Sequence, residues 1–280
     1  MKNKAEFDWV FRQIKNHKDL LNDKDEELAE LFRLCDNKEQ QDLVGSLLER
    51  FFFLDGKHYG TLLADMAKYI KSLEYPIDKT VVLAMAIDDK PDSSQEVLQN
   101  LKVYLAKEFD KEIKQCNSMS DLNGLYNRGY RHFIVVDEFV GSGKTIRSRF
   151  KNRFNKIKVT SPATIIFCIL TGMDKAVNEL VNEGVPIKVF HRIERGISDF
   201  YIGKSLTNNI AQMYALESKL ADSINGLKLS DYSFGYKKSE AIYYKENGNI
   251  PNNVFPIFWW KKYKNSTYRN TLFTRVQDGY

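Results

Sequence analysis

Apolar residues recur every three or four positions along the first quarter of the chain, which is the spacing of amphipathic helices. Residues 1–75 are therefore predicted to form a helical N-terminal region. Its apolar stripes fit packing inside the protein, and they equally fit an interface with a partner or with a second copy in a homo-oligomer. The clearest stripes are Phe7, Val10, Phe11 and Ile14; Leu28, Leu31 and Leu34; and Leu62, Leu63, Met66, Ile70 and Leu73.

Beyond Pro76 the pattern changes to short, continuous apolar runs separated by helix-permissive segments. Continuous runs of strand length are typical of strands covered on both faces. Strands that alternate with helices form a parallel sheet with right-handed crossovers, so the predicted fold class is α/β. The predicted strands are residues 81–87, 133–136, 163–170 and 186–190, and the predicted helices are residues 95–108, 122–126, 146–156 and 173–182.

We place the α/β core at residues 76–204 and assign residues 205–280 to a C-terminal elaboration that completes the same domain. The elaboration is predicted to contain a helix at residues 205–222 and a strand at residues 235–244. A loop with Asn and Pro residues follows at residues 249–260. Its aromatic side chains either seal the core or line a pocket.

The most informative stretch is residues 133–145, where four apolar residues lead into Asp137 and Glu138 and then toward a Gly-Ser-Gly-Lys-Thr loop. This pattern predicts a strand, a glycine-rich turn and a helix, an arrangement whose backbone N–H groups bind phosphate. Two adjacent acids at the end of an apolar strand are costly unless they are solvated or used. We therefore treat them as functional candidates, with a buried strand and an ordinary turn as the alternative.

One phosphate-binding interpretation is the P-loop of nucleotide hydrolases, Gly-x4-Gly-Lys-Ser/Thr. Residues 143–145 match the end of that motif, but Glu138 occupies the position of its first glycine. A carboxylate at that position would repel a triphosphate. The P-loop is therefore the less favoured interpretation.

The same stretch resembles the phosphoribosyl-diphosphate-binding motif of type I phosphoribosyltransferases, in which four apolar residues, two acids and two apolar residues precede a small loop. The resemblance implies that Asp137 and Glu138 are the catalytic pair and accept hydrogen bonds from the ribose 2′- and 3′-hydroxyls. Carboxylates are pure acceptors and match a diol, whereas backbone N–H and hydroxyl groups donate to a phosphate. The residues that the resemblance assigns to the 5′-phosphate are Gly141, Ser142, Gly143, Lys144 and Thr145.

Two positions depart from the pattern of that family. Several members carry an acid at the place of Gly141, where it acts as a general base toward the incoming nucleobase, and glycine cannot do so. The second acid, usually Asp, is the longer Glu138. The resemblance thus implies sugar-phosphate binding without the usual base salvage, and a non-catalytic sensor of a ligand or nucleic acid is the alternative.

Asp88, Asp89 and Lys90 follow the first core strand, where phosphoribosyltransferases have their diphosphate-binding loop. The resemblance implies that Lys90 contacts the diphosphate and that Asp88 or Asp89 touches Mg²⁺ through water. It also places Mg²⁺ near Asp137 and Glu138, through the ligand or water. An ordinary polar turn is the alternative for residues 88–90.

Arg192 and Arg195 follow the last predicted core strand. Arginine suits bidentate recognition of phosphate, so both residues are candidates for substrate binding. Surface ion pairs with Glu194 and Asp199 are the alternative.

Three segments together resemble the phosphoribosyltransferase-like domains called PRTase-CE, from about residue 25 to the C-terminus. The resemblance implies an effector of a prokaryotic antiphage system, with a phosphorylated ribose or nucleotide as ligand. It also implies partners such as a retron reverse transcriptase with its nucleic acid, or an ATPase. The segments are Asp-Glu-Phe-Val-Gly-Ser-Gly-Lys-Thr, Arg-Gly-Ile-Ser-Asp and Pro-Asn-Asn-x-x-Pro-Ile-Phe-Trp.

Composition adds limits to these expectations. No apolar run approaches the length of a membrane span and the N-terminus lacks an apolar signal core, so we expect no membrane association and a cytoplasmic location. The three cysteines are widely separated, which fits a reducing compartment. The net charge of +5 is modest, and the lysine-rich segments 151–158 and 261–264 are either nucleic-acid contacts or solvated faces.

Overall fold

The computed structural model describes residues 3–87, 92–154 and 162–276. The chain divides into two compact units, which we name by their content. The sheet unit is Gly56–Arg192, and the terminal unit combines Met1–Asp55 with Ile193–Tyr280. Each unit is built from its own core, as described below.

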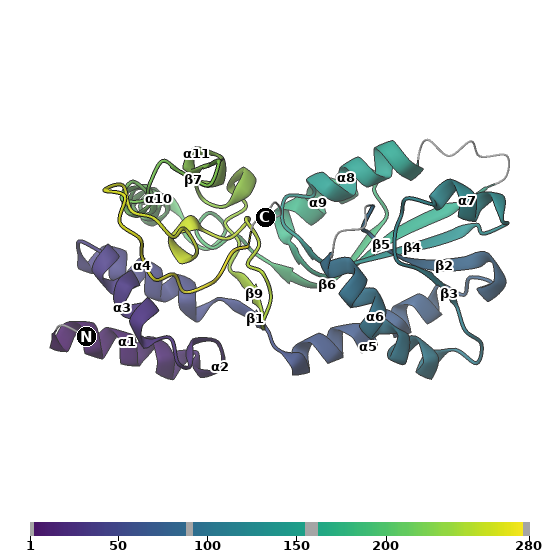
Figure 1. The fold of residues 1–280 in the computed structure, drawn as a ribbon, viewed down its shortest axis with the longest axis horizontal. Coiled ribbons are helices and arrows are strands. Elements are labelled where there is room, and N and C mark those ends of the chain that lie inside the picture. Colours follow the sequence, from purple (N-terminus) through teal and green to yellow (C-terminus); the bar gives the residue numbers. More distant parts are fainter. Residues whose placement is uncertain (1–2, 88–91, 155–161, 277–280) are drawn as a thin grey trace. The chain divides into compact units, whose positions relative to one another are not determined.

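The sheet unit contains five strands in the order β3-β2-β4-β5-β6 (Figure 1). Strand β2 pairs in parallel with both β3 and β4, and β4 pairs in parallel with β5. The predicted α/β class with a parallel sheet is therefore confirmed, and β4 is its middle strand. The bounds are β2 (Thr80–Ala84), β3 (Lys114–Cys116), β4 (His132–Val140), β5 (Thr164–Met173) and β6 (Ile187–Ile193).

Helices cover both faces of this sheet, which explains why its strands are continuous apolar runs. Along β4, Phe133 and Val135 pack on one face with residues of α7, α8 and α9. The intervening Ile134 and Val136 pack on the other face with α5 and α6. The helices are α5 (Gly56–Ser72), η1 (Ile77–Lys79), α6 (Ser93–Glu108), α7 (Leu122–Asn127), α8 (Lys144–Arg149), the π-helical turn η2 (Phe150–Phe154) and α9 (Asp174–Asn182).

The terminal unit is mainly helical, and a parallel pair of short strands, β1 and β9, joins its N-terminal and C-terminal segments. Its first part comprises α1 (Lys4–Asn16), α2 (Lys18–Leu21), α3 (Asp25–Leu34), α4 (Lys38–Glu49) and β1 (Phe52–Leu54). Its second part comprises α10 (Gly203–Glu217), β7 (Ser223–Ile224), β8 (Leu227–Lys228), α11 (Leu229–Tyr232), η3 (Tyr236–Lys238), β9 (Tyr243–Lys245) and η4 (Pro256–Phe258).

The aromatic loop seals the core of the terminal unit. Phe255, Phe258 and Trp260 are fully buried. The ring of Phe258 meets the ring of Phe51 edge to face, with the centroids 5.5 Å apart. Burial of such large side chains supplies much of the stabilisation that a small unit needs, so these residues belong to packing.

The compact units do not follow the boundaries predicted near residues 75 and 204. Helix α5, predicted as part of the N-terminal region, packs its residues Leu63, Met66 and Ile70 against the sheet. Residues 1–55 instead pack with the segment from Ile193 onward. Amphipathic spacing identifies a buried face but does not identify the surface that covers it.

The strand predicted at residues 235–244 is replaced by a 3-10 turn, and only β9 at its end is extended. Phe234, Lys237, Lys238 and Glu240 have φ values of 58°, 59°, 53° and 50°. These values lie in the left-handed region, which is incompatible with a β-strand. The predicted strand is therefore wrong except at the end of the segment.

Two features bear on the expectations from composition. Within the described ranges, no helix combines the length and the apolarity required to cross a bilayer. The three cysteines are free thiols: Cys35 and Cys168 are buried, and Cys116 is half-buried.

Candidate functional site

The acid pair lies within the middle strand of the sheet. Asp137 is paired with Ile169 of β5, and the strand continues past both acids to Val140. The exposed fractions are only 7% for Asp137 and 8% for Glu138. Strand β4 therefore holds two carboxyl groups in a largely dehydrated position near its C-terminal end, where ligands bind in parallel α/β sheets.

The surroundings of Asp137 disfavour its ionised form. Its Oδ1 accepts a hydrogen bond from the Ser93 hydroxyl at 3.2 Å and another from the Glu138 N–H at 2.8 Å. Burial, followed by the negative charges of Asp92 and Glu138, outweighs these donors and raises the pKa of Asp137 to about 8. A strongly shifted carboxyl at a ligand-binding edge is typical of a functional site.

Asp92 and Ser93 are site residues that the sequence alone did not reveal. Helix α6 begins at Ser93, and Asp92 is its N-cap: the Asp92 side chain accepts from Ser94 N–H, and Gln95 completes a capping box. The helix was predicted at residues 95–108, and it begins two residues earlier. The strand order explains why these two residues lie at the site. Strand β2 lies next to β4, so the helix that follows β2 begins beside the acid pair.

The phosphate-loop candidate connects β4 to α8. Gly143 is the N-cap of α8 and has φ of 71°, in the left-handed region that favours glycine. A Cβ on Gly143 would lie 3.2 Å from Leu180, which adds a steric reason for glycine. Buried Ile146 anchors the first turn of α8. The predicted order of strand, glycine turn and helix is therefore confirmed for this loop.

The loop presents a mixture of buried and accessible groups. Gly141 and Gly143 are buried and Ser142 is half-buried, whereas Lys144 and Thr145 are exposed. The loop thus places an ammonium group and a hydroxyl at the surface, directly after a turn whose backbone is packed. Such a turn can donate N–H groups to an anion.

Helix α8 is shorter than predicted. It ends at Arg149, and a π-helical turn, η2, follows. Arg147 of α8 donates from Nε to both carboxylate oxygens of Glu183, at 2.9 and 2.6 Å. The guanidinium of Arg147 therefore fastens α8 to the end of α9.

The remaining predicted residues fall outside this cluster or outside the described ranges. Asp88, Asp89 and Lys90 lie outside the described residues. Arg192, on β6, forms an ion pair with Asp174 and donates to the side chain of Asn178 at 2.5 Å. Its charge is therefore engaged with helix α9.

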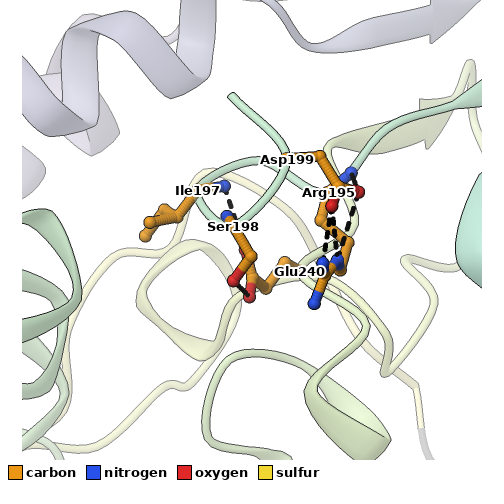
Figure 2. Close-up of polar contacts among 5 residues, drawn as sticks. All are labelled: Arg195, Ile197, Ser198, Asp199 and Glu240. Carbon is orange, nitrogen blue, oxygen red and sulfur yellow. Dashed lines mark hydrogen bonds and ion pairs between the residues drawn. The ribbon is translucent and has the colours of Figure 1, made fainter. Parts of the chain in front are cut away.

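Arg195 belongs to the terminal unit. Its guanidinium donates to Asp199 at distances from 2.5 to 3.1 Å, which matches the ion-pair alternative (Figure 2). The buried carboxylate of Glu240 holds the same turn, accepting from the N–H groups of Ile197 and Ser198 at 2.9 and 2.7 Å. The Arg-Gly-Ile-Ser-Asp segment is thus a turn fixed by two carboxylates.

The acid pair fits a magnesium ion that arrives with its ligand. Within the described ranges, no group of three or more His, Cys, Asp or Glu side chains is placed to hold a metal. Mg²⁺ typically keeps several waters and uses one or two carboxylates together with substrate phosphates. The negative charges of Asp92 and Glu138 raise the pKa of Asp137 further than burial alone, and a cation would relieve this repulsion.

The fold and the family match together define a phosphoribosyltransferase-like α/β protein. The chain matches the PRTase-CE family over residues 22–275 and belongs to that family, which confirms the resemblance found in its motifs. No curated protein matches the chain significantly.

Two solved structures are similar to parts of this chain. One is a hypothetical protein from Neisseria gonorrhoeae with bound ppGpp, with a TM-score of 0.35 and 14% identity over 59% of this chain and 97% of that chain. The other is hypoxanthine-guanine phosphoribosyltransferase from Schistosoma mansoni in complex with IMP, with a TM-score of 0.33 and 16% identity over 53% of this chain and 67% of that chain.

Proposed function

We propose that this protein binds the ribose 5-phosphate group of phosphoribosyl diphosphate or of a nucleotide and acts at the anomeric carbon. Asp137 and Glu138 accept hydrogen bonds from the ribose diol. The loop from Gly141 to Thr145 binds the 5′-phosphate. The observation that carries the proposal is the burial of Asp137 and Glu138 in the middle strand, shortly before a glycine turn that leads into a helix.

A diol explains why such an unfavourable carboxyl is present. Each ribose hydroxyl donates a hydrogen bond, and donors stabilise the ionised form of a carboxyl group. Ligand binding would thus lower the pKa of Asp137 from about 8 and release a proton near neutral pH. A buried acid with no ligand to serve would only cost stability.

The reaction that this arrangement supports is displacement at the anomeric carbon. The bond between that carbon and the leaving atom breaks. The leaving atom is an oxygen of the diphosphate in phosphoribosyl diphosphate and a nitrogen of the base in a nucleotide. The leaving group departs with the electron pair, and a nucleophile forms the new bond. Because Gly141 offers no general base, catalysis rests on positioning and on stabilisation of an oxocarbenium-like state.

Mg²⁺ is the cofactor that we propose for the diphosphate ligand. When bound, it would supply positive charge that stabilises a departing diphosphate. Asp137 and Glu138 would hold it, through the ligand or through water. The two carboxylates also orient the diol, so the same charges serve both groups.

For the biological role, we propose an effector of a prokaryotic antiphage system, acting with a reverse transcriptase and its nucleic acid or with an ATPase. Membership of PRTase-CE supports this role. An effector that consumes phosphoribosyl diphosphate or nucleotides would harm an infected cell by depletion.

The second candidate function is a non-catalytic sensor with the same ligand. Gly141 is the observation that favours it, because the position of the usual general base carries no functional group. The two candidates differ in turnover. The enzyme consumes phosphoribosyl diphosphate or a nucleotide in a magnesium-dependent reaction, whereas the sensor binds its ligand saturably and leaves it intact.

Calorimetric titration of phosphoribosyl diphosphate with Mg²⁺ tests the binding site. We expect the wild type to bind and the Asp137→Asn/Glu138→Gln double variant not to bind. A matched control, Glu112→Gln/Asp121→Asn, removes the same charge from exposed positions of the sheet unit and should bind normally. Absence of binding to the folded wild type would refute the diphosphate as ligand.

Phosphorus NMR of the same mixtures then separates enzyme from sensor, because it follows the ligand over time. A P-loop hydrolase would instead release phosphate from ATP in a manner dependent on Lys144 and Thr145. That result would overturn the ribose-phosphate assignment of the loop.

A further inference from the structure

A cavity lies in the terminal unit. Its volume is about 590 Å³, within the range of small-molecule sites, about 300–1,000 Å³. It is lined by residues from the end of α10, the β7–β8 hairpin and α11, and by the residue after α11. The residues used below are Tyr214, Glu217, Asp222, Lys228 and Ser233.

Glu217 is the unusual residue of this cavity. Its exposed fraction is only 3%, and it is the last residue of α10. Burial raises the pKa of the Glu217 carboxyl to about 7, against the opposing effect of its two hydrogen bonds. The C-terminal end of a helix carries a partial negative charge and disfavours an acid. Both effects would be relieved by a positive charge beside the carboxylate.

The hydrogen bonds of Glu217 leave room for such a partner. Oε1 accepts from the Phe234 N–H at 2.9 Å, and Oε2 accepts from the Ser233 hydroxyl at 2.5 Å. An ionised carboxylate has about four acceptor sites, so these two bonds do not saturate it. Both neighbouring groups donate to the carboxylate, so the oxygens of Glu217 already act as hydrogen-bond acceptors.

The wall of the cavity adds an aromatic surface. Tyr214 precedes Glu217 by one helical turn and keeps 47% of its surface exposed. Its ring is supported by Phe234, with the ring centroids 4.7 Å apart. An exposed aromatic face attracts organic cations. The other charged residues of the lining are Asp222 and Lys228, so the ionised cavity carries two acids and one base.

We propose that this cavity binds the guanidinium or alkylammonium group of an organic cation, with Glu217 as the charge partner and Tyr214 as the aromatic wall. The cation can come from a free small molecule or from an arginine or lysine side chain of a peptide. The site is separate from the ribose-phosphate site and its occupancy does not depend on the function proposed above.

The test is calorimetric titration at physiological salt with butylguanidinium, with its neutral isostere butylurea, and with an acetylated, amidated Gly-Arg-Gly tripeptide. We expect saturable binding of butylguanidinium to the wild type and at least about tenfold weaker binding of butylurea, because the neutral compound lacks the charge that pairs with a carboxylate. Tripeptide binding as tight as that of butylguanidinium would identify a side chain as the source. Binding of butylguanidinium alone would identify a free cation.

Variants separate recognition from structure. Glu217→Gln keeps an acceptor oxygen for the Phe234 N–H, and its NH2 group can donate to the Ser233 hydroxyl in place of the bond that Glu217 accepts. The variant has nearly the same size and lacks the negative charge, so we expect affinity to fall at least about tenfold. Asp231→Asn, an exposed acid on α11 outside the cavity lining, is the matched control and should bind like the wild type. Tyr214→Leu should weaken binding several-fold. Failure of both cations to bind, or equal binding by Glu217→Gln, would overturn the proposal.

Discussion

Replacement of Asp137 by Asn should stabilise the sheet unit, although it removes a carboxyl group of the proposed ribose-phosphate site. The carboxyl has an ordinary pKa of 3.8 in the unfolded chain and a pKa of about 8 in the folded protein. At pH 7 the Asp137 carboxyl is therefore ionised in the unfolded chain and mostly protonated in the folded protein. Its ionisation thus stabilises the unfolded chain relative to the folded protein. Over the 3.2 pH units between 3.8 and 7, this difference amounts to about 4 kcal/mol.

The expected net gain from Asp137→Asn is smaller than this limit. The Asn carbonyl oxygen can keep the hydrogen bonds from Ser93 and from the Glu138 N–H. Its amide group, however, brings two donors into a buried position, which costs about 1–3 kcal/mol if they lack acceptors. We therefore expect the variant to be more stable by about 1–3 kcal/mol at pH 7.

The pH dependence gives the sharper signature. A carboxyl with a raised pKa contributes most to stability at low pH, and this contribution is lost as the pH rises toward the folded pKa of about 8. The Asn variant does not titrate at this position. The difference in free energy of unfolding between variant and wild type should thus grow from pH 4 to pH 8.

Hydrogen exchange of the β4 amides measures the stability of the sheet unit. All three tryptophans, Trp9, Trp259 and Trp260, lie in the terminal unit, so their fluorescence serves as an internal control that should not change. Asp121→Asn makes the same substitution at an exposed position and should show no growing difference. A difference for Asp137→Asn that is constant across this pH range would refute the argument.

Two further substitutions test the local geometry. Gly143→Ala forces a residue with a side chain into the left-handed region and places its Cβ against Leu180. We therefore expect β4 amide exchange to show a loss of about 1–2 kcal/mol in stability, and we expect weaker binding of phosphoribosyl diphosphate. An unchanged affinity would count against the loop as the phosphate site. Glu240→Ala leaves the N–H groups of Ile197 and Ser198 without their buried acceptor. Unfolding followed by tryptophan fluorescence should show that the terminal unit loses about 2–4 kcal/mol of stability, and Glu240→Gln should lose less. Equal losses in the two Glu240 variants would show that hydrogen bonding is not the cause.

Much of the sheet unit was predictable from local pattern. Continuous apolar runs identified β2, β4 and β5, because strands buried on both faces are rich in apolar residues. Strand β6 was also predicted, although its Lys188 and Arg192 are exposed. The short strand β3, Lys114–Cys116, was missed because its residues are largely exposed or polar. The acid pair and the glycine loop were also visible, since both depend on residues that are adjacent in the sequence.

The terminal unit was less predictable because contacts between distant segments hold it together. Strand β1 lies within residues 1–75, which were predicted to be helical. Its extended form depends on pairing with β9. Likewise, the left-handed residues before β9 carry no glycine signal except Gly235. They are held by contacts such as the hydrogen bond from the Glu240 N–H to the Phe234 carbonyl, 2.8 Å long.

The sequence by itself determined the α/β class, most of the strands and helices of the sheet unit, and the acid pair with its glycine loop. These features follow from the spacing of neighbouring residues, and spacing is a local property. Only the tertiary structure placed Asp92 and Ser93 beside Asp137 and enclosed Glu217 in a cavity. Burial and the charges of residues distant in sequence set the pKa of such groups, and those depend on how the chain packs rather than on its local pattern.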